Sequence, residues 1–522
     1  MTVLCAKAGN IYAKFGYTTD KGDGCVASSN QHSAPLTARL DDNLNCVRDR
    51  FGISADLIIR RLTVDGRSAA VLSVEGMVDR HLMADGVILP LSRIHQGMSA
   101  PELMEHVRDH VLGFTDMLQT DTVDELIELM MSGFGAVLID GVPYAVLGGL
   151  QAFMIRGISE PSTEMTMRGS REGFTEAIRI NISMIRRRMK TPDLIFEMMS
   201  AGKSSRTAVC LCYRRDRVSP QLLQSVRSRI EQLPLDTVLE SGYVQPFLES
   251  KGRSLFSEVG ITERPDTLCG KIEEGRIGVL VDGTPFVLVV PTLFVENFQS
   301  MDDYAVHPAF ASFLRIIKYI AFAISILLPS IYVSIGTFHP EMLPTHFLST
   351  IIEAERTTPF SLMSEALLIH FLFEIMREAG LRFPKALGHA VSIVGALVIG
   401  DAAVGAGLIG APMVIVVGLT AISSFVIPAL YGPMALLRFG FIVLGGWLGL
   451  YGVVLGVCVL ISSICSLNIQ TIPYTAPLTP FQRHALKDVL IRSDWRNLWN
   501  RSFRVQNMVG SHIADQKERK GE

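Results

Sequence analysis

The feature that most constrains this chain is an apolar run from His389 to Pro428. The run contains no Lys, Arg or Glu, and Asp401 is its only acidic residue. A transmembrane helix needs ~20 mainly apolar residues to cross the hydrocarbon of a bilayer. The run is long enough for two such helices, with a natural break at Gly410–Pro412. It therefore predicts a membrane domain with several crossings.

Asp401 should raise the free energy of inserting this apolar run into a membrane. A carboxylate inside a membrane helix costs ~2.5–3.5 kcal/mol on insertion scales, and such residues usually face a protein interior or a water-filled path. One interpretation places Asp401 in a pore. The other places it at a helix end near the headgroups, or in a hydrogen bond inside the bundle. The candidate pore-lining residues are Val394, Asp401, Val404, Gly405 and Leu408.

Composition divides the chain into a soluble part and a membrane part. With 522 residues the chain is too long for a single core, so at least two domains are expected. Hydrophobic residues make up 48% and the mean hydropathy is +0.33, yet the apolar excess lies almost wholly after Phe310. The net charge of −3 gives no argument for a nucleic-acid partner, and we expect none.

The eight cysteines are scattered and show no zinc-ligand or redox spacing. Their pattern does not suggest a disulfide framework, which fits a cytosolic soluble part. The first residues lack the apolar core of a secretory signal, so we expect later helices to drive insertion.

The predicted fold class is an α/β N-terminal cytoplasmic region of two related subdomains, followed by an all-α polytopic transmembrane domain. About four to six spans are expected in the latter. The expected parts are a flexible leader (1–35), a first α/β subdomain with linker helices (36–200), a second α/β subdomain (201–310), the transmembrane domain (311–480) and a basic cytoplasmic tail (481–522).

Local patterns in the soluble part predict its first elements. Alternating apolar residues indicate a strand pair, Asp56–Val64 and Ala69–Val74, joined by a turn at Asp65-Gly66. Helices are expected over Leu36–Phe51, closed by the following glycine, and over Thr122–Ser132.

A short motif occurs twice in the soluble part. Residues 135–144 read GAVLIDGVPY, and residues 278–286 read GVLVDGTPF. Both copies contain Val-Leu, a β-branched residue, Asp-Gly, one residue, Pro and an aromatic. Asp-Gly is a common hairpin turn, which explains part of the match. The repeated Pro and aromatic favour two related subdomains over coincidence.

A charged segment lies between the two copies. We expect a helix from Arg171 to about Lys190 with Ser170 as its N-cap, and a second helix after Thr191-Pro192. Charged residues of this segment are expected to form ion pairs that fix the linker between the subdomains. They are Arg156, Glu160, Arg168, Arg171 and Glu172. The alternative is contact with another copy of the chain or with anionic headgroups.

The membrane part is expected to begin near Phe313. Arg315 and Lys318 flank the first predicted span, Ile320–Ile335. Because positive residues mark the inner side of membrane helices, the soluble region is expected in the cytoplasm.

The next candidate helix, Leu362–Met376, carries polar groups that we expect inside the membrane. His370 and Glu374 are four residues apart and share a face, whereas Glu365 lies on the opposite face. The segment is short for a span. It is either a span packed inside an oligomer or an interfacial helix.

The run Phe439–Leu467 is too long for one plain span. Two pairs of glycines spaced by four, Gly445/Gly449 and Gly452/Gly456, allow close helix approach. The tail that follows is basic and therefore prefers the cytoplasm, which requires an even number of crossings. We expect a broken or hairpin passage here. The alternative is one long tilted helix with an external tail.

Common catalytic motifs are missing from the sequence. Gly202-Lys203-Ser204 resembles the end of a phosphate-binding loop, but the required upstream glycine is Glu197. No zinc-protease, nucleophile-elbow or dinucleotide-binding pattern occurs. We therefore expect no enzyme activity, no catalytic residue, no metal site and no cofactor.

Several stretches together resemble the A subunit of the GerA-type spore germination receptors. The resemblance runs from about Leu36 to Pro480, and its stretches are specific only in combination. They are RGISEP, RGSREGFTEAIRINISMIRRR, TERPD at Thr262–Asp266, VPTLFVENFQSMDDY, HPEMLP at His339–Pro344, FEIMREAGLRFPKALG and SIVGALVIGDAAVGAGLIGAPMVIVV.

The resemblance implies a multi-pass protein of the inner spore membrane with a cytoplasmic N-terminal domain. It implies two partners besides membrane lipid, a transporter-like B subunit and a lipoprotein C subunit. It also implies that A subunits assemble into a homo-oligomeric ring, and that this ring is a nutrient-gated ion channel.

Some departures leave other roles open. Asp401 lies where members often have another polar residue such as Gln, and the stretch before Pro473-Tyr474 lacks an expected Gly. The leader and the basic tail are also atypical of a three-subunit receptor. One alternative is the related SpoVAF type, which assists germination without a dedicated nutrient-sensing partner. Another is a non-conducting scaffold that holds the B and C subunits.

Overall fold

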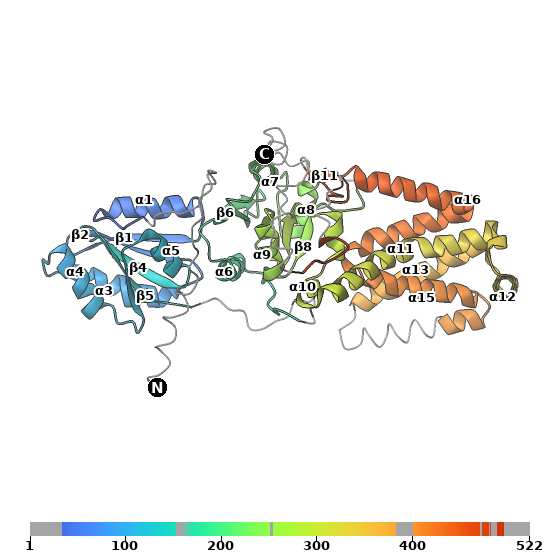
Figure 1. Ribbon diagram of the computed structural model, residues 1–522, viewed down its shortest axis with the longest axis horizontal. Helices are drawn as coiled ribbons and strands as arrows, with labels where there is room; N and C mark the ends of the chain where they lie inside the picture. The colour runs from blue at the N-terminus through green and yellow to red at the C-terminus, as the bar shows by residue number, and fades with distance from the viewer. Residues whose placement is uncertain are drawn as a thin grey trace, which may run out of the picture.

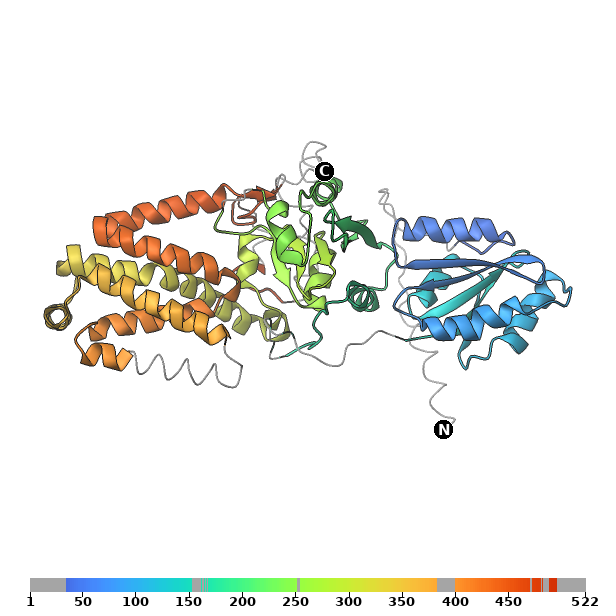
Figure 2. The same cartoon turned by 180° about the vertical axis from the view of Figure 1, so that it is seen from behind.

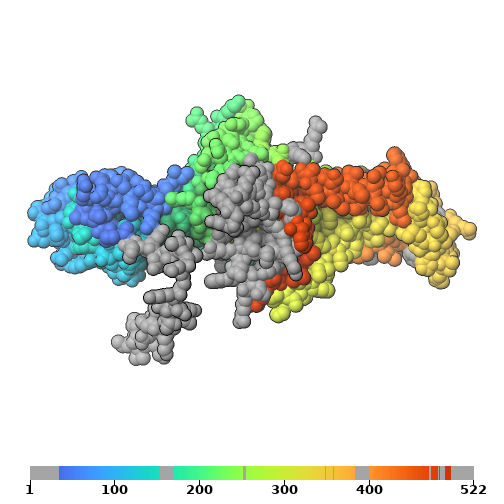
Figure 3. Space-filling view, turned by 45° about the horizontal axis from the view of Figure 1, so that its top comes forward, coloured from blue at the N-terminus to red at the C-terminus, as the bar shows by residue number. Residues whose placement is uncertain are grey.

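The protein is described here by a computed structural model that covers residues 34–152, 161, 164, 166, 168–250, 254–382, 400–469, 472–479, 481 and 488–494. Three units lie in line: two subdomains built on β-sheets and a bundle of long helices (Figure 1). The view from behind shows the same order (Figure 2). In the space-filling view the second subdomain, in green, lies between the first subdomain and the helices (Figure 3).

The first subdomain is a five-stranded antiparallel sheet in the order β1-β2-β4-β5-β3. Its strands are β1 Leu57–Val64, β2 Arg67–Val74, β3 Met117–Thr120, β4 Phe134–Ile139 and β5 Ala145–Gly149. Successive residues of a strand point to opposite faces, and both faces of this sheet are covered. One face packs against α1 (Leu40–Phe51) and α5 (Val123–Met130). The other packs against α2 Arg80–Met83, η1 Ala84–Ile88, α3 Leu89–Ser92, α4 Ala100–His106 and η2 Val107–Val111.

The second subdomain repeats this plan. Its five antiparallel strands follow the equivalent order β6-β7-β9-β10-β8. The strands are β6 Leu194–Ala201, β7 Thr207–Arg214, β8 Gly260–Thr262, β9 Ile277–Val281 and β10 Val287–Val290. Helices α6 (Ile178–Arg188) and α9 (Pro265–Glu273) cover one face, and α7 (Pro220–Glu231) and α8 (Ser241–Leu248) cover the other. The prediction of two related subdomains is therefore confirmed.

The aspartate of the repeated motif has the same role in both subdomains. Oδ1 of Asp140 accepts a hydrogen bond from the backbone N of Leu40 at the start of α1 (3.0 Å). Oδ1 of Asp282 accepts one from the backbone N of Ile178 at the start of α6, also at 3.0 Å. The glycine after each aspartate has a positive φ, 97° and 93°. The motif is thus a turn whose carboxylate caps a helix from another part of the chain.

A second shared contact strengthens these caps. The side chain of Asn43 accepts from the backbone N of Thr37 (2.8 Å) and donates to its carbonyl (2.7 Å). Asn181 does the same with Thr175, at 2.7 Å for both bonds. The spacing Thr-x-x-Leu/Ile-x-x-Asn is therefore a further signature of the repeat, which the sequence reading missed.

Local predictions for the first subdomain are confirmed. The strand pair forms around Asp65 and Gly66, both with positive φ. Helix α1 ends at Gly52, whose backbone N donates to the carbonyl of Arg48 (2.7 Å) with φ 60°. It begins at Leu40, four residues later than expected.

Predictions for the linker were partly wrong. Ser170 does not cap a helix, because α6 begins only at Ile178. The segment after Thr191 is strand β6 instead of a helix, because it pairs along its whole length with β7. The expected division at residues 200/201 would therefore cut the second sheet, and both α6 and β6 belong to the second subdomain.

The helical part consists of long helices joined by short connections. Its elements are η3 Phe294–Phe298, α10 Asp302–Ala305, α11 Pro308–Phe338, η4 Pro340–Met342, α12 Thr345–Thr357, α13 Leu362–Arg382, α15 Ala411–Phe425, η5 Pro428–Leu430 and α16 Tyr431–Cys465, followed by β11 Asn468–Ile469 and β12 Ile472–Pro473. Residues 400–405 are also helical. Helix α11 continues through Pro329. Helix α13 reaches Arg382, beyond the expected end at Met376.

Helix α16 reverses direction at Gly449, where φ is 63° and ψ is −152°. Two antiparallel stretches result, seen on either side of the α16 label in Figure 1. A Cβ at Gly452 would lie 2.5 Å from the carbonyl oxygen of Leu444, and one at Gly456 would lie 2.8 Å from the Phe441 ring. The glycines therefore permit the two stretches to pack closely. This agrees with the expected hairpin passage.

Two helices within the described ranges are long and apolar enough to cross a membrane, Pro308–Phe338 and Pro428–Cys465. Ala411–Phe425 is a shorter apolar helix. Both ends of α16 lie on the side of the second subdomain, because Met434 and Ile464 share an apolar cluster with Phe256 and Phe298.

The two aspartate caps predict matched losses of stability. Replacing Asp140 or Asp282 by Ala leaves helix N–H groups without an acceptor, so each change should lower the free energy of unfolding by about 1–2 kcal/mol. The Asn variants, which keep an acceptor oxygen, should lose less. Chemical unfolding of the full chain followed by circular dichroism measures this. Asp85→Ala, which removes an exposed aspartate, is the control and should change little.

Candidate functional site

The two subdomains are joined by a buried ion pair. Arg186 on α6 and Asp56 before β1 are 0% and 2% exposed. Nε of Arg186 donates to one carboxylate oxygen of Asp56 at 2.6 Å, and Nη2 donates to the other at 3.2 Å. Such a two-pronged pair is the strongest geometry that a guanidinium and a carboxylate can form. It fixes the first subdomain to the second.

Neighbouring groups complete this contact. Arg186 also donates to the carbonyls of Thr191 (2.7 Å) and Leu194 (2.9 Å), and its guanidinium lies 4.9 Å from the Phe196 ring centroid. The backbone N of Ala55 donates to the Phe196 carbonyl at 2.8 Å. The loop that follows α1 therefore contacts α6 and the start of β6.

The predicted linker residues are only partly brought together. Arg156 and Glu160 lie outside the described residues. Glu172 pairs with Arg187 and with Arg188 (2.6 Å) of α6, within the second subdomain. Partial burial alone would raise the pKa of Glu172, but the two arginines lower it below its usual value. Arg171 is exposed.

Contacts of the linker with later parts of the chain were not foreseen. The backbone N of Arg168 lies 3.4 Å from the Asp302 carboxylate at the start of α10. Arg264, in the TERPD stretch, is 2% exposed and donates to the Ser170 carbonyl (2.9 Å) and to Thr166 Oγ1 (3.0 Å). Burial raises the pKa of Glu164, whose carboxylate accepts a hydrogen bond from Thr262 at 2.7 Å.

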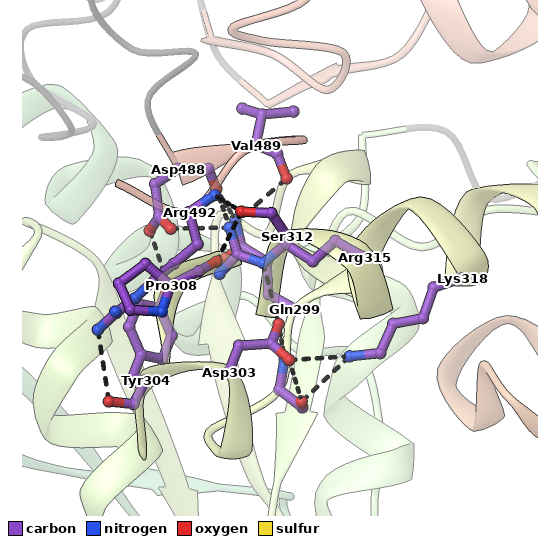
Figure 4. Close-up of polar contacts among 11 residues, drawn as sticks. Gln299, Asp303, Tyr304, Pro308, Ser312, Arg315, Lys318, Asp488, Val489 and Arg492 are labelled. Carbon is purple, nitrogen blue, oxygen red and sulfur yellow. Dashed lines mark hydrogen bonds and ion pairs between the residues drawn. The ribbon is translucent and has the colours of Figure 1, made fainter. Parts of the chain in front are cut away.

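A second buried ion network lies where the second subdomain meets the helices. We call it the junction cluster: Asp303, Tyr304, Arg315, Lys318, Asp488 and Arg492 (Figure 4). Arg315, on the first turns of α11, is 0% exposed. Its Nε donates to Asp303 at 3.0 Å, and its Nη1 donates to the side chain and the carbonyl of Asp488 at 2.8 and 2.7 Å. Lys318 contacts Asp303 at 3.3 Å.

The segment from Asp488 is held at the junction by further contacts. The Tyr304 hydroxyl donates to Asp488 at 2.7 Å, and Gln299 donates to the Asp488 carbonyl at 2.6 Å. Val489 is fully buried among apolar residues at the start of η3 and in the β11–β12 region. The backbone N of Arg492 donates to Ser312 at 2.9 Å. Burial and the nearby Asp488 carboxylate raise the pKa of Tyr304 well above its usual value, so the hydroxyl stays a donor.

Aromatic packing surrounds the junction cluster. The rings of Phe298 and Tyr319 stack with centroids 4.0 Å apart, and Phe294 meets Phe322 and Tyr474 edge to face at 5.9 Å. Nearby, the fully buried Arg276 pairs with Glu296 and Glu274. Burial alone would raise the pKa of Glu296, but Arg276 and Lys271 lower it. The second subdomain, α11 and the segment Asp488–Arg492 therefore pack against one another.

A third polar group lies inside the helical part. Glu374 of α13 accepts hydrogen bonds from the Tyr431 hydroxyl at 2.8 and 2.9 Å and from Arg377 at 3.2 Å. Arg438 of α16 approaches Glu374 to 3.5 Å. His370, one turn from Glu374 on α13, is fully buried. His370 and Glu374 thus lie on the side of α13 that faces α16.

Glu365 lies at the far end of the bundle. It is 1% exposed, and its Oε1 accepts a hydrogen bond from the backbone N of Gly410 at 2.6 Å. Gly410 is the residue before α15, so the carboxylate lies at the positive end of that helix dipole.

The candidate pore-lining residues lie on the surface of the single chain. Asp401, Gly405 and Leu408 are exposed and Val404 is half-buried; Val394 lies outside the described residues. The helical turn that carries Asp401 ends at residue 405, so the carboxylate is within about one turn of a helix end. The exposed side chains form a partly polar surface next to the buried Ala403 and Ile409.

Comparison with known proteins gives a consistent family match. The chain matches the family model described as Bacillus/Clostridium GerA spore germination protein over residues 45–503. It is 38% identical to Spore germination protein KA of Bacillus subtilis (strain 168), covering 88% of this chain and 85% of that protein. It is 33% identical to the Uncharacterized membrane protein YfkQ of the same strain, covering 94% and 95%.

Two further relatives are relevant. The chain is 28% identical to Stage V sporulation protein AF of Bacillus subtilis (strain 168), over 85% of this chain and 90% of that protein. Among solved structures, it matches the N-terminal domain of the A subunit of the Bacillus megaterium spore germinant receptor GerK3 with 30% identity and a TM-score of 0.40. That match covers 50% of this chain and 98% of the other.

The Asp56–Arg186 pair predicts strong non-additivity. Removing one partner leaves a buried charge unpaired, so Asp56→Leu or Arg186→Met alone should cost about 3–5 kcal/mol of unfolding free energy. The double variant should cost less than the sum of the two. Chemical unfolding of the four proteins gives the coupling. The exposed pair Arg382–Glu378 is the control, for which the coupling should be below about 1 kcal/mol.

The junction cluster predicts a local loss of protection. Asp488→Asn removes one of the two carboxylates that neutralise Arg315, so the segment around α10 and the start of α11 should open more often. Hydrogen exchange of the full chain should then be faster over residues 300–312, while β1 and β2 are unchanged. Equal exchange in wild type and variant would contradict a coupling role. Arg382→Gln, at an exposed arginine of α13, is the matched control.

Proposed function

Because this chain belongs to the Bacillus/Clostridium GerA spore germination protein family, we propose that it is the A-type membrane subunit of a spore germination receptor. In this proposal several copies assemble into a ring in the inner spore membrane. The ring is an ion channel that opens in response to the nutrient signal.

The exposure of Asp401 is the observation that supports the channel. A carboxylate that faces hydrocarbon is costly, and among the described residues no hydrogen bond or ion pair to Asp401 offsets this cost. A neighbouring copy or a shared aqueous centre would remove the cost. With Gly405 and Leu408 exposed on the same short segment, a ring of aspartates beside apolar side chains would favour cations and close by dewetting.

The junction cluster supports a relay from the soluble part to the helices. Arg315 is bound both to Asp303, next to the second subdomain, and to Asp488, which follows the last helix. A displacement of the second subdomain therefore cannot leave α11 in place without breaking buried ion pairs. The cost of breaking them makes concerted movement the cheaper response.

The arrangement in the membrane follows from the same contacts. Arg315 and Lys318 at the start of α11 favour a cytoplasmic soluble region, and the reversal at Gly449 returns the end of α16 to that side. In the proposed receptor the partners are a transporter-like B subunit and a lipoprotein C subunit.

The accessory SpoVAF-type role is the second candidate, supported by the similarity to Stage V sporulation protein AF. That similarity is lower than the similarity to Spore germination protein KA, at 28% against 38% identity. The accessory role is therefore the weaker candidate, and so is the role of a non-conducting scaffold.

Conductance of the reconstituted chain tests the proposal. In planar bilayers the wild-type protein should pass cations in preference to anions, and Asp401→Asn should reduce this preference because the charged ring is lost. Glu353→Gln, at an exposed residue of α12, is the control and should leave selectivity unchanged. Native mass spectrometry of the same sample gives the number of copies.

Three results would contradict the channel proposal or favour another role. A strictly monomeric chain in its native bilayer, or cation selectivity unchanged by Asp401→Asn, would remove the Asp401 ring from the account. Ion flux that appears only when a B subunit is added would favour the scaffold.

A further inference from the structure

Two buried polar side chains face each other between α13 and α16. We call them and the adjacent carboxylate the bundle site: His370, Glu374 and Arg438. Arg438 and His370 are both 0% exposed, and Arg438 is close enough to act electrostatically on the His370 ring. The site lies about two helical turns beyond Tyr431, the first residue of α16, within the apolar part of the bundle.

The hydrogen-bonding capacity of the site is largely unused by the protein. Nε of Arg438 donates to the Ser325 carbonyl of α11 at 2.9 Å. No protein atom among the described residues accepts a hydrogen bond from Nη1 or Nη2 of Arg438, or bonds to either ring nitrogen of His370. Buried polar groups are normally satisfied, so buried nitrogen atoms that make no hydrogen bond to the described protein indicate a ligand.

The charge of the site indicates the sign of that ligand. The two oxygens of Glu374 are already engaged by Tyr431 and Arg377, and Nη1 of Arg438 lies further away at 3.5 Å. One carboxylate therefore serves two guanidiniums. The site carries an excess of positive charge in a region where an uncompensated charge costs several kcal/mol.

We propose that the bundle site binds a small monovalent anion of the chloride class. The Nη groups of Arg438 and one N–H of His370 supply the donors, and the anion supplies the charge that Glu374 cannot. Water would satisfy the donors but would leave the positive charge uncompensated. The bound anion would link α13 to α16, whichever role the whole protein has in germination.

Thermal unfolding in different salts tests this site. The full chain, purified in detergent or nanodiscs, is heated in sodium chloride and in sodium gluconate at equal sodium concentration and ionic strength. Chloride should raise the midpoint by about 2–4 °C with a saturating dependence on its concentration, because a ligand that binds only the folded state stabilises it. Bromide should act like chloride.

Two variants at the bundle site and one control show whether the chloride effect on the unfolding midpoint arises at this site. Arg438→Gln should abolish the difference between chloride and gluconate. If that variant does not fold, His370→Leu keeps the charge balance, removes one donor, and should raise the half-saturating chloride concentration about tenfold. Arg382→Gln, at an exposed arginine on α13, should keep the wild-type response.

Two results would overturn the proposal. An unfolding midpoint that is equal in chloride and gluconate would mean that the site holds water only. A chloride response that persists in full in both Arg438→Gln and His370→Leu would place any anion elsewhere on the protein.

Discussion

The structure depends on the burial of one guanidinium, that of Arg315. Removing an arginine from water costs several kcal/mol, and only well-placed acceptors offset that cost. One acceptor, Asp303, is local, and the other, Asp488, lies 173 residues later in the chain. Burial of Arg315 therefore requires α10, the start of α11 and the segment after the last helix to come together. Aromatic packing around Phe298 and Tyr319 then excludes water from the pair.

An ion pair with a buried arginine joins neighbouring units at three places along the molecule. Asp56 and Arg186 join the first subdomain to the second, Arg315 joins the second subdomain to α11, and Glu374 with Arg438 joins α13 to α16. These contacts lie in successive units from one end of the molecule to the other (Figure 1). Buried pairs of this kind contribute little net stability, yet breaking one is costly. Such contacts suit a protein whose units must move together, as the proposed relay requires.

Much of the fold was predictable because it follows local rules. The strand pair around Asp65 and the end of α1 at Gly52 follow from turn and cap preferences. The repeated Asp-Gly motif indicated two related subdomains. The length of the last apolar run and the basic tail indicated a broken or hairpin passage, and the structure has the reversal at Gly449. The identity of β6 was missed because pairing with β7 overrides the helix-start signal at Thr191-Pro192. The start of α6 was also missed, since the helix begins at Ile178. Arg315 was interpreted only as a marker of orientation.

By itself, the sequence determined the order of soluble and membrane parts, the duplicated subdomain and the apolar stretches, because these depend on composition and short spacing. Only the tertiary structure decided which charges are buried, and with which partners. Asp140 caps a helix that begins 100 residues earlier, and Arg315 pairs with a carboxylate 173 residues later. The free energy of an ion pair or a helix cap depends on the distance between the groups and on their burial. The separation of two residues along the chain specifies neither quantity.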